Sequence, residues 1–236
     1  MIIHPKIYPL EPEAVTVEFD NTIDEVINKK VMALYTYLLA NRFNGMKDII
    51  PAYATLTIIF NASQVRKTYN ANSPLFFVTS FLEKAVDDCD WSILFQHKII
   101  EVPVCYEETF GIDLKEMSHT LAISIDDIIR LHTTKTYRVY MIGFLPGFAY
   151  MGSVDETIAY PRKHQPRKHI PAGSVGIAGK QTGIYPLGSP GGWNIIGRTP
   201  IKMFDASKEN PTFLEPGNEI KFIPISRSEF DKLLSV

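Results

Sequence analysis

The chain has 236 residues, of which 45% are hydrophobic and 21% charged, and its formal net charge is −2 at pH 7. This composition is ordinary for a soluble globular protein of one or two domains, and the lack of a basic excess gives no reason to expect nucleic acid as a partner. The N-terminus has no basic segment followed by an apolar core, and the uncharged run 139–154 is too short and too broken by Gly and Pro to span a bilayer. We therefore expect a cytoplasmic protein.

The N-terminal half alternates predicted strands and helices, as judged from the spacing of its apolar residues. The predicted elements are a strand over 14–19, a helix from 23 to about 44, a strand over 53–60, a helix within 74–88 and an extended segment over 93–103. This order predicts a small α+β domain over residues 1–98, with a ferredoxin-like split β-α-β topology. No loop of clustered polar groups occurs before residue 100, which favours a scaffold or docking role for this domain.

The composition changes near residue 99, where we expect a second domain over 99–236 to begin. Residues 102–106 are interpreted as an edge strand, because Pro103 cannot donate to a ladder. A short helix over 113–119, a helix capped by Ser124 and a strand over 137–142 follow. His132 lies at the C-terminal end of the second helix, where the helix dipole would stabilise an imidazolium.

The stretch from Gly143 to Arg198 is dense in glycine and proline, with 11 of the 14 glycines of the chain. Glycine costs about 1 kcal/mol and proline about 3 kcal/mol in a helix interior, so this stretch predicts short strands joined by tight turns. No Asp or Glu occurs from Thr157 to Phe204, and we call residues 157–204 the acid-free block. Its cations are Arg162, Lys163, Arg167, Lys168, Lys180, Arg198 and Lys202. Unless these are neutralised from elsewhere, the block should attract small anions.

Several known motifs are absent from this block. Gly176 and Gly179 are too close together for a phosphate-binding P-loop, and no Gly-x-Ser-x-Gly sequence of a serine hydrolase occurs. His164 and His169 are separated by Pro166, which prevents a helix that could align them on a metal. No metal site is predicted.

The lack of carboxylates also bears on mechanism. Phosphoryl transfer needs Mg²⁺, which Asp or Glu normally holds, and general-base chemistry at neutral pH needs a His or a carboxylate. In the acid-free block only His164 and His169 qualify. Chemistry on an acidic substrate would therefore need groups from another part of the chain or from another protein, which predicts a shared active site.

Several long motifs of the C-terminal half resemble the allophanate hydrolase subunit 1 family. They are Arg130–His132, Tyr137–Gly152, Pro171–Gly179, Gln181–Pro186, Ser189–Trp193 and Ile196–Pro200. That family includes the B subunit of bacterial 5-oxoprolinase and the KipI inhibitor of a sporulation histidine kinase. The N-terminal half agrees in element order and in Ile50–Tyr53, but Glu11-Pro12 stands where many members carry Gly-Asp.

The resemblance implies a cyclophilin-like, mainly β barrel over 99–236 and two partners, the 5-oxoprolinase subunits A and C. Together these chains would open 5-oxo-L-proline to L-glutamate, with ATP as co-substrate and Mg²⁺ held with help from the partners. An isolated chain is then expected to be inactive. Two alternatives stay open, namely a protein inhibitor of a sensor histidine kinase and a component that processes allophanate or urea.

We interpret one set of residues as the site of this chemistry. His132 and Arg198 are the predicted catalytic residues, and Arg198 would clamp a carboxylate or phosphate with its planar fork. Gly191 and Gly192 would let the backbone approach the ligand. The remaining predicted substrate- or ATP-binding residues are Phe144, Pro146, Phe148, Tyr150, Lys180, Gln181, Tyr185 and Trp193.

Overall fold

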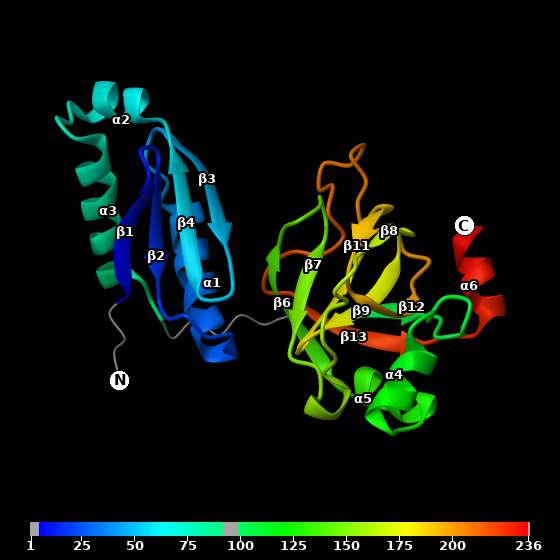
Figure 1. The fold of residues 1–236 in the computed structure, drawn as a ribbon. Helices are drawn as coiled ribbons and strands as arrows, with labels where there is room; N and C mark the ends of the chain where they lie inside the picture. Colours follow the sequence, from blue (N-terminus) through cyan, green and yellow to red (C-terminus); the bar gives the residue numbers. More distant parts are fainter. Residues whose placement is uncertain (1–4, 92–98, 236) are drawn as a thin grey trace. The chain divides into compact units, whose positions relative to one another are not determined.

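The structure is a computed structural model that describes residues 5–91 and 99–235 of the chain. The chain divides into two compact units, residues 1–96 and 97–236, each with its own hydrophobic core (Figure 1). The predicted boundary after residue 98, and the part of the predicted extended segment from 93 to 98, lie outside the described residues. None of the helices described is long and apolar enough to cross a membrane.

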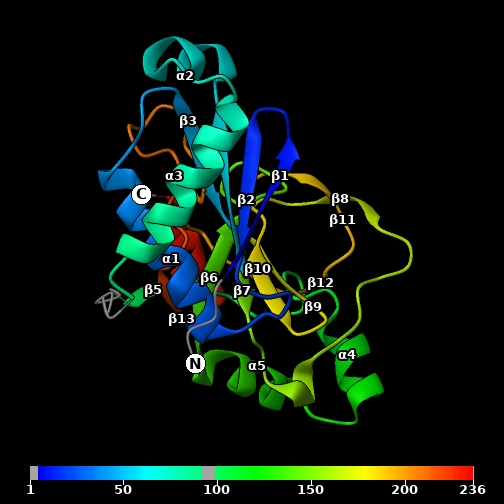
Figure 2. The same cartoon turned by 90° about the vertical axis from the view of Figure 1, so that its left-hand side faces the viewer.

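The N-terminal unit is a four-stranded antiparallel sheet covered by helices. Its elements are β1 (Lys6–Glu11), β2 (Ala14–Glu18), α1 (Glu25–Ala40), β3 (Met46–Pro51), β4 (Thr55–Phe60), α2 (Ala62–Tyr69) and α3 (Pro74–Asp88). The strand order is β1-β2-β4-β3, so β4 lies between the two strands that α1 connects. Helix α1 packs on β3 and β4, and α3 packs on β1 and β2 (Figure 2).

This unit is α+β, as predicted, but the strand at the β2 edge of its sheet is not the one expected. The strand beside β2 is β1, which forms a hairpin with it, and not a strand that follows the last helix. The predicted strands over 14–19 and 53–60 and both predicted helices are present. Helix α1 begins later than predicted, because Asp24 is the residue that caps it, accepting a hydrogen bond from the Ile27 N–H at 3.0 Å.

The C-terminal unit is built on a seven-stranded mixed sheet with the order β12-β9-β10-β7-β6-β13-β5. Its strands are β5 (Ile99–Val104), β6 (Thr136–Ile142), β7 (Ala149–Gly152), β8 (Arg167–Ile170), β9 (Ser174–Ala178), β10 (Gln181–Ile184), β11 (Ser189–Gly191), β12 (Asn194–Arg198) and β13 (Glu219–Pro224). Its helices are α4 (Leu114–Leu121), α5 (Ile125–Thr134), the 3-10 turn η1 (Glu156–Ile158) and α6 (Arg227–Leu234). Strands β8 and β11 form a separate two-stranded sheet.

The large sheet curls into a nearly closed barrel. Beyond the end of β5, Cys105 exchanges both backbone hydrogen bonds with Arg198 of β12, at N···O distances of 2.8 and 2.9 Å. We call this pairing the seam. The interior is filled by a buried apolar cluster that includes Val104, Val139 and Phe222. The prediction of an α+β unit followed by a mainly β barrel unit is confirmed, and β5 is an outer strand, as Pro103 predicts.

A buried carboxylate fixes the acid-free block to the rest of the barrel unit. The Asp113 side chain, only 1% exposed, accepts both guanidinium hydrogen bonds of Arg167, at 2.6 and 2.9 Å. Its Oδ1 also lies 3.0 Å from the Lys163 ammonium, and its Oδ2 accepts the Ile195 N–H at 2.6 Å. One acidic residue from outside the block thus joins β8, the loop before it and β12 to the start of α4.

We predict that Asp113→Asn lowers the free energy of unfolding by about 3 kcal/mol, because it leaves the largely covered Arg167 without its ion-pair partner, whereas Lys163 keeps Glu116 at 2.9 Å. The Lys163 and Arg167 side chains are only 18% and 28% exposed, so water replaces the carboxylate poorly. Denaturant unfolding measures the change. Glu156→Gln is the control, since it breaks an exposed ion pair with Lys180 and should leave the unfolding midpoint nearly unchanged. Equal midpoints for the two variants would contradict this role of Asp113.

Candidate functional site

Four aromatic side chains gather on the face of the sheet that is opposite the barrel interior. On β7, Ala149 and Met151 belong to the interior cluster, whereas Tyr150 and Phe148, the residue just before the strand, alternate with them and belong to a separate cluster. Tyr185 and Trp193 complete this cluster, with ring centroids 5.2 and 5.3 Å from that of Phe148. We call Phe148, Tyr150, Tyr185 and Trp193 the aromatic face.

The aromatic face is only partly accessible. Phe148 is 1% and Trp193 7% exposed, so these rings are mainly packing. Tyr150 is half-buried, and Phe144, which packs edge-on against Phe148 at 5.6 Å, is 59% exposed. A ligand would therefore touch the rim of the cluster rather than its centre. The structure brings these predicted residues together, and their role in binding stays a prediction.

Arg162, which is not among the predicted site residues, lies close to the hydroxyls of this face. Its guanidinium lowers the pKa of the Tyr150 and Tyr185 hydroxyls, although burial raises both pKa values more strongly. Arg162 makes no hydrogen bond or ion pair with any of the described residues. Its presence in the acid-free block was the only signal in the sequence, and that signal did not distinguish it from its basic neighbours.

Gly191 makes room for Tyr185 of the aromatic face, and Gly192 makes room for Arg162. A Cβ at Gly191 would lie 2.3 Å from the Tyr185 hydroxyl oxygen, and one at Gly192 would lie 2.8 Å from Nε of Arg162. Neither distance is compatible with a side chain unless Tyr185 or Arg162 moves. The two glycines therefore allow Tyr185 and Arg162 to pack against the backbone, whereas their predicted contact with a ligand stays a prediction.

His132 lies in the barrel interior and not at the aromatic face. Its ring nitrogens form hydrogen bonds with the Tyr106 and Thr182 hydroxyls, both at 2.9 Å, and its ring stacks on Phe222 at 4.6 Å. The side chain has no exposed surface, and burial lowers its pKa to about 3. The imidazole is therefore neutral, contrary to the predicted helix-terminal imidazolium, and in this structure no substrate can touch it.

The other predicted polar residues lie at separate places. Lys180 is exposed, and its ammonium lies 2.6 Å from a carboxylate oxygen of Glu156. Gln181 is half-buried on β10, and Pro146 is exposed in the loop between β6 and β7. Arg198 lines a small recess beside α6 that none of the aromatic-face residues lines. The predicted residues therefore do not share one pocket.

Carboxylates from outside the acid-free block neutralise most of its cations. Lys163 and Arg167 bind Asp113, Lys180 binds Glu156, and Lys202 lies 3.0 Å from Asp205. Arg162, Lys168 and Arg198 form no ion pair with the residues described. The positive charge available to a small anion is therefore concentrated on far fewer groups than the sequence suggests.

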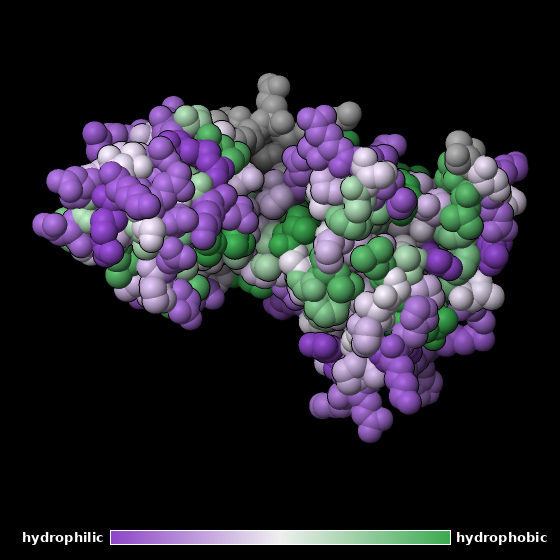
Figure 3. Space-filling model, turned by 90° about the horizontal axis from the view of Figure 1, so that it is seen from above, coloured by the Kyte–Doolittle hydropathy of each residue, from purple (hydrophilic) through white to green (hydrophobic). Residues whose placement is uncertain are grey.

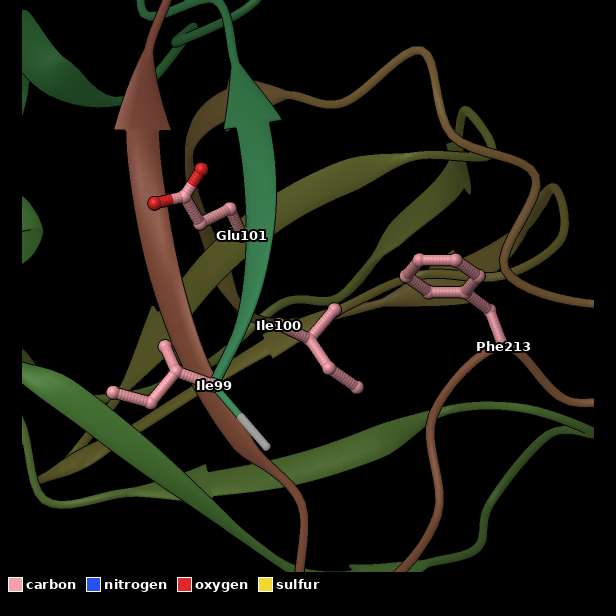
Figure 4. A pocket seen from close by; sticks show the side chains of 4 residues that line it. All are labelled: Ile99, Ile100, Glu101 and Phe213. Atoms are coloured by element: carbon pink, nitrogen blue, oxygen red, sulfur yellow. The ribbon is translucent and has the colours of Figure 1, made fainter. Parts of the chain in front are cut away.

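A larger cavity in the barrel unit is lined mainly by apolar side chains among the described residues. It measures about 600 Å³ and is lined by Ile99, Ile100, Glu101 and Phe213 (Figure 4). Ile100 points toward Phe213, and among the described lining residues the charged one, Glu101, is an acid. None of the predicted site residues lines it. In the part of the chain that is described, no group of three His, Cys, Asp or Glu side chains is placed to hold a metal ion.

Residues 5–214 match the family described as carboxyltransferase domain, subdomain C and D. The B subunit of 5-oxoprolinase from Bacillus subtilis (strain 168) is 38% identical over 232 residues, which cover 98% of this chain and 97% of that protein. The crystal structure of TTHA0988 matches 90% of this chain with a TM-score of 0.78 and 31% identity, but the match covers only 40% of that longer chain. The urea amidolyase of Saccharomyces cerevisiae is 24% identical over 93% of this chain and 13% of that protein.

The buried His132 leads to a prediction about pH. An unfolded histidine binds a proton below about pH 6.5, whereas folded His132 does so only near pH 3, so between these values the unfolded state binds more protons. His132 should therefore cost the protein about 2 kcal/mol of stability between pH 7 and pH 5. Denaturant unfolding at both pH values should show a smaller pH-dependent loss for His132→Gln than for the unmodified chain. Equal losses would show that His132 is accessible to protons.

Proposed function

Because the chain belongs to the carboxyltransferase domain, subdomain C and D family, we propose that it is the B subunit of an ATP-dependent 5-oxoprolinase, which opens 5-oxo-L-proline to L-glutamate. The observation that carries this proposal is the match with the B. subtilis protein, which extends over nearly the whole length of both chains. The two proteins therefore share the N-terminal unit as well as the barrel unit, and not only one common domain.

The proposed contribution of this chain is to bind and orient an anionic substrate. Free Arg162 would donate hydrogen bonds to a carboxylate or phosphate, and charge-assisted bonds of this kind are the strong ones. Tyr150 of the aromatic face and the neighbouring, exposed Phe144 would cover one side of the substrate ring and exclude water from it. An amide carbonyl resists water, and phosphorylation of its oxygen would turn that oxygen into a leaving group.

Partner chains would supply what the described residues lack. Among the described residues, Arg162 could bind the phosphates of ATP, but no group of three His, Cys, Asp or Glu could hold a metal ion. We therefore propose that Mg²⁺ is held with residues of the partners. The TTHA0988 chain is more than twice as long as the part that this chain matches, which supports a further domain or partner chain next to the barrel. The surface of the C-terminal unit carries apolar patches among polar side chains, which suits contacts with a partner (Figure 3).

A second candidate function is a role in urea or allophanate processing. The similarity to urea amidolyase supports it, since that match also covers most of this chain. The identity is lower than for the 5-oxoprolinase relative, and for that reason we place this function second. Substrate preference separates the two, because a 5-oxoprolinase complex should not respond to urea.

We predict that the chain is required for, but not sufficient for, ATP-dependent formation of glutamate from 5-oxo-L-proline. The test reconstitutes the chain with 5-oxoprolinase subunits A and C and measures glutamate. Omission of this chain should abolish activity, and the chain alone should show none. Activity on urea alone, or inhibition of a sensor histidine kinase by the chain with no glutamate formed in the complex, would overturn the proposal in favour of an alternative.

Arg162→Ala tests the proposed site within that complex. Loss of a charge-assisted hydrogen bond should raise the KM for one of the anionic substrates by about tenfold or more. Arg66→Ala is the matched control, because Arg66 is exposed on α2 and has no ion pair with a described residue. If both variants change KM equally, the effect is one of net charge and Arg162 does not belong to the site.

A further inference from the structure

Arg198 lies in a recess that is separate from the aromatic face. The recess has a volume of about 280 Å³. Residues of the turn before β9, of the end of β12 and of α6 line it. Lys202, Phe230 and Leu234 also line it.

The guanidinium of Arg198 is held in place, but only part of its hydrogen-bond donors have a partner among the described residues. Its Nε donates a hydrogen bond to the Ala172 carbonyl oxygen at 2.8 Å, and its Cζ lies 5.7 Å from the centre of the Phe110 ring. Its terminal nitrogens donate to no acceptor among the described residues, and no described carboxylate lies within ion-pair distance. By contrast, Arg167 gives both terminal nitrogens to Asp113. Arg198 therefore offers a pre-oriented pair of donors.

Helix α6 forms a fixed wall of the recess. Ser226 and Glu229 form a capping box at its start, and the Arg227 N–H donates to a Glu107 carboxylate oxygen at 3.2 Å. Phe230 is 2% exposed and its ring lies 4.5 Å from that of Phe110, the ring that also faces Arg198. The helix lies beyond residue 214, where the match to the family ends. The recess is thus completed by a segment outside the family-matched region.

We propose that this recess binds a small molecule through a single carboxylate. The planar fork of one arginine matches a carboxylate in a two-point contact. A dianionic phosphate needs more positive charge, and the second cation of the recess, Lys202, is already offset by Asp205 at 3.0 Å. Phe230 and Leu234 supply apolar contact for the rest of the ligand. The volume is slightly below the range usual for ligand pockets, which restricts the ligand to a compact acid.

The experiment titrates the isolated full-length chain with acetate, 5-oxo-L-proline, L-glutamate and inorganic phosphate, and follows the Arg198 Nε–H signal and chemical shifts by NMR. We expect at least one carboxylate to bind more tightly than phosphate. Arg198→Ala should weaken this binding by about tenfold or more, and Arg66→Ala should leave it unchanged. Circular dichroism of each variant checks that it folds.

A second variant keeps the proposal testable if Arg198→Ala does not fold. Leu234 is 62% exposed at the recess, so Leu234→Glu should fold and place a competing carboxylate beside Arg198. It should weaken binding of the added carboxylates by a similar factor. The proposal is overturned if phosphate binds more tightly than every carboxylate, if no carboxylate binds, or if Arg66→Ala and Arg198→Ala have equal effects. Binding is measured on the chain alone, so this inference does not rest on the 5-oxoprolinase assignment and can fail independently of it.

Discussion

The carboxylate of Asp113 is the interaction on which the C-terminal unit depends. The acid-free block would bring Lys163 and Arg167 close together with no internal counter-charge, and burial of uncompensated cations is costly. Asp113 reaches the block from the start of α4, binds both cations and accepts the backbone N–H of Ile195. It therefore sets the positions of β8 and β12 together, and these strands border the aromatic face. Asp113, which lies outside the candidate site, therefore fixes the positions of two strands beside that site.

Neutralisation also determines which cations remain available for function. Lys180 and Lys202 are paired with nearby acids, as Lys163 and Arg167 are with Asp113. Arg162 and Arg198 keep free guanidinium donors in two different surroundings, one beside aromatic rings and one in a narrow recess. Local charge, and not the net charge of the block, therefore determines where an anion can bind. The single site expected from the sequence becomes two separate places.

The sequence predicted the elements whose apolar pattern is regular and missed the others. Strands β2 and β4 and helices α1 and α3 were predictable, because their apolar residues follow the period of a strand or helix. Strand β1 contains Pro9, and α2 is mostly polar, so neither gave such a signal. The aromatic cluster was predictable as a group, since its residues are close in a Gly-rich stretch. The ion-pair partners were not, because Asp113 and Arg167 are 54 positions apart. For His132 the helix dipole indicated a charged ring, but tertiary burial outweighs it.

The seam gives Arg198 a double role, because its backbone closes the barrel while its side chain faces the recess. The seam consists of a reciprocal pair of backbone hydrogen bonds with Cys105, whereas β12 pairs with β9, and β5 with β13, along several residues of each strand. A molecule that binds only when Arg198 is in place stabilises every state in which the two strand ends are joined. Occupancy of the recess and opening of the barrel are then thermodynamically linked. Binding of a small carboxylic acid would therefore stabilise the closed barrel against separation of its two terminal strands.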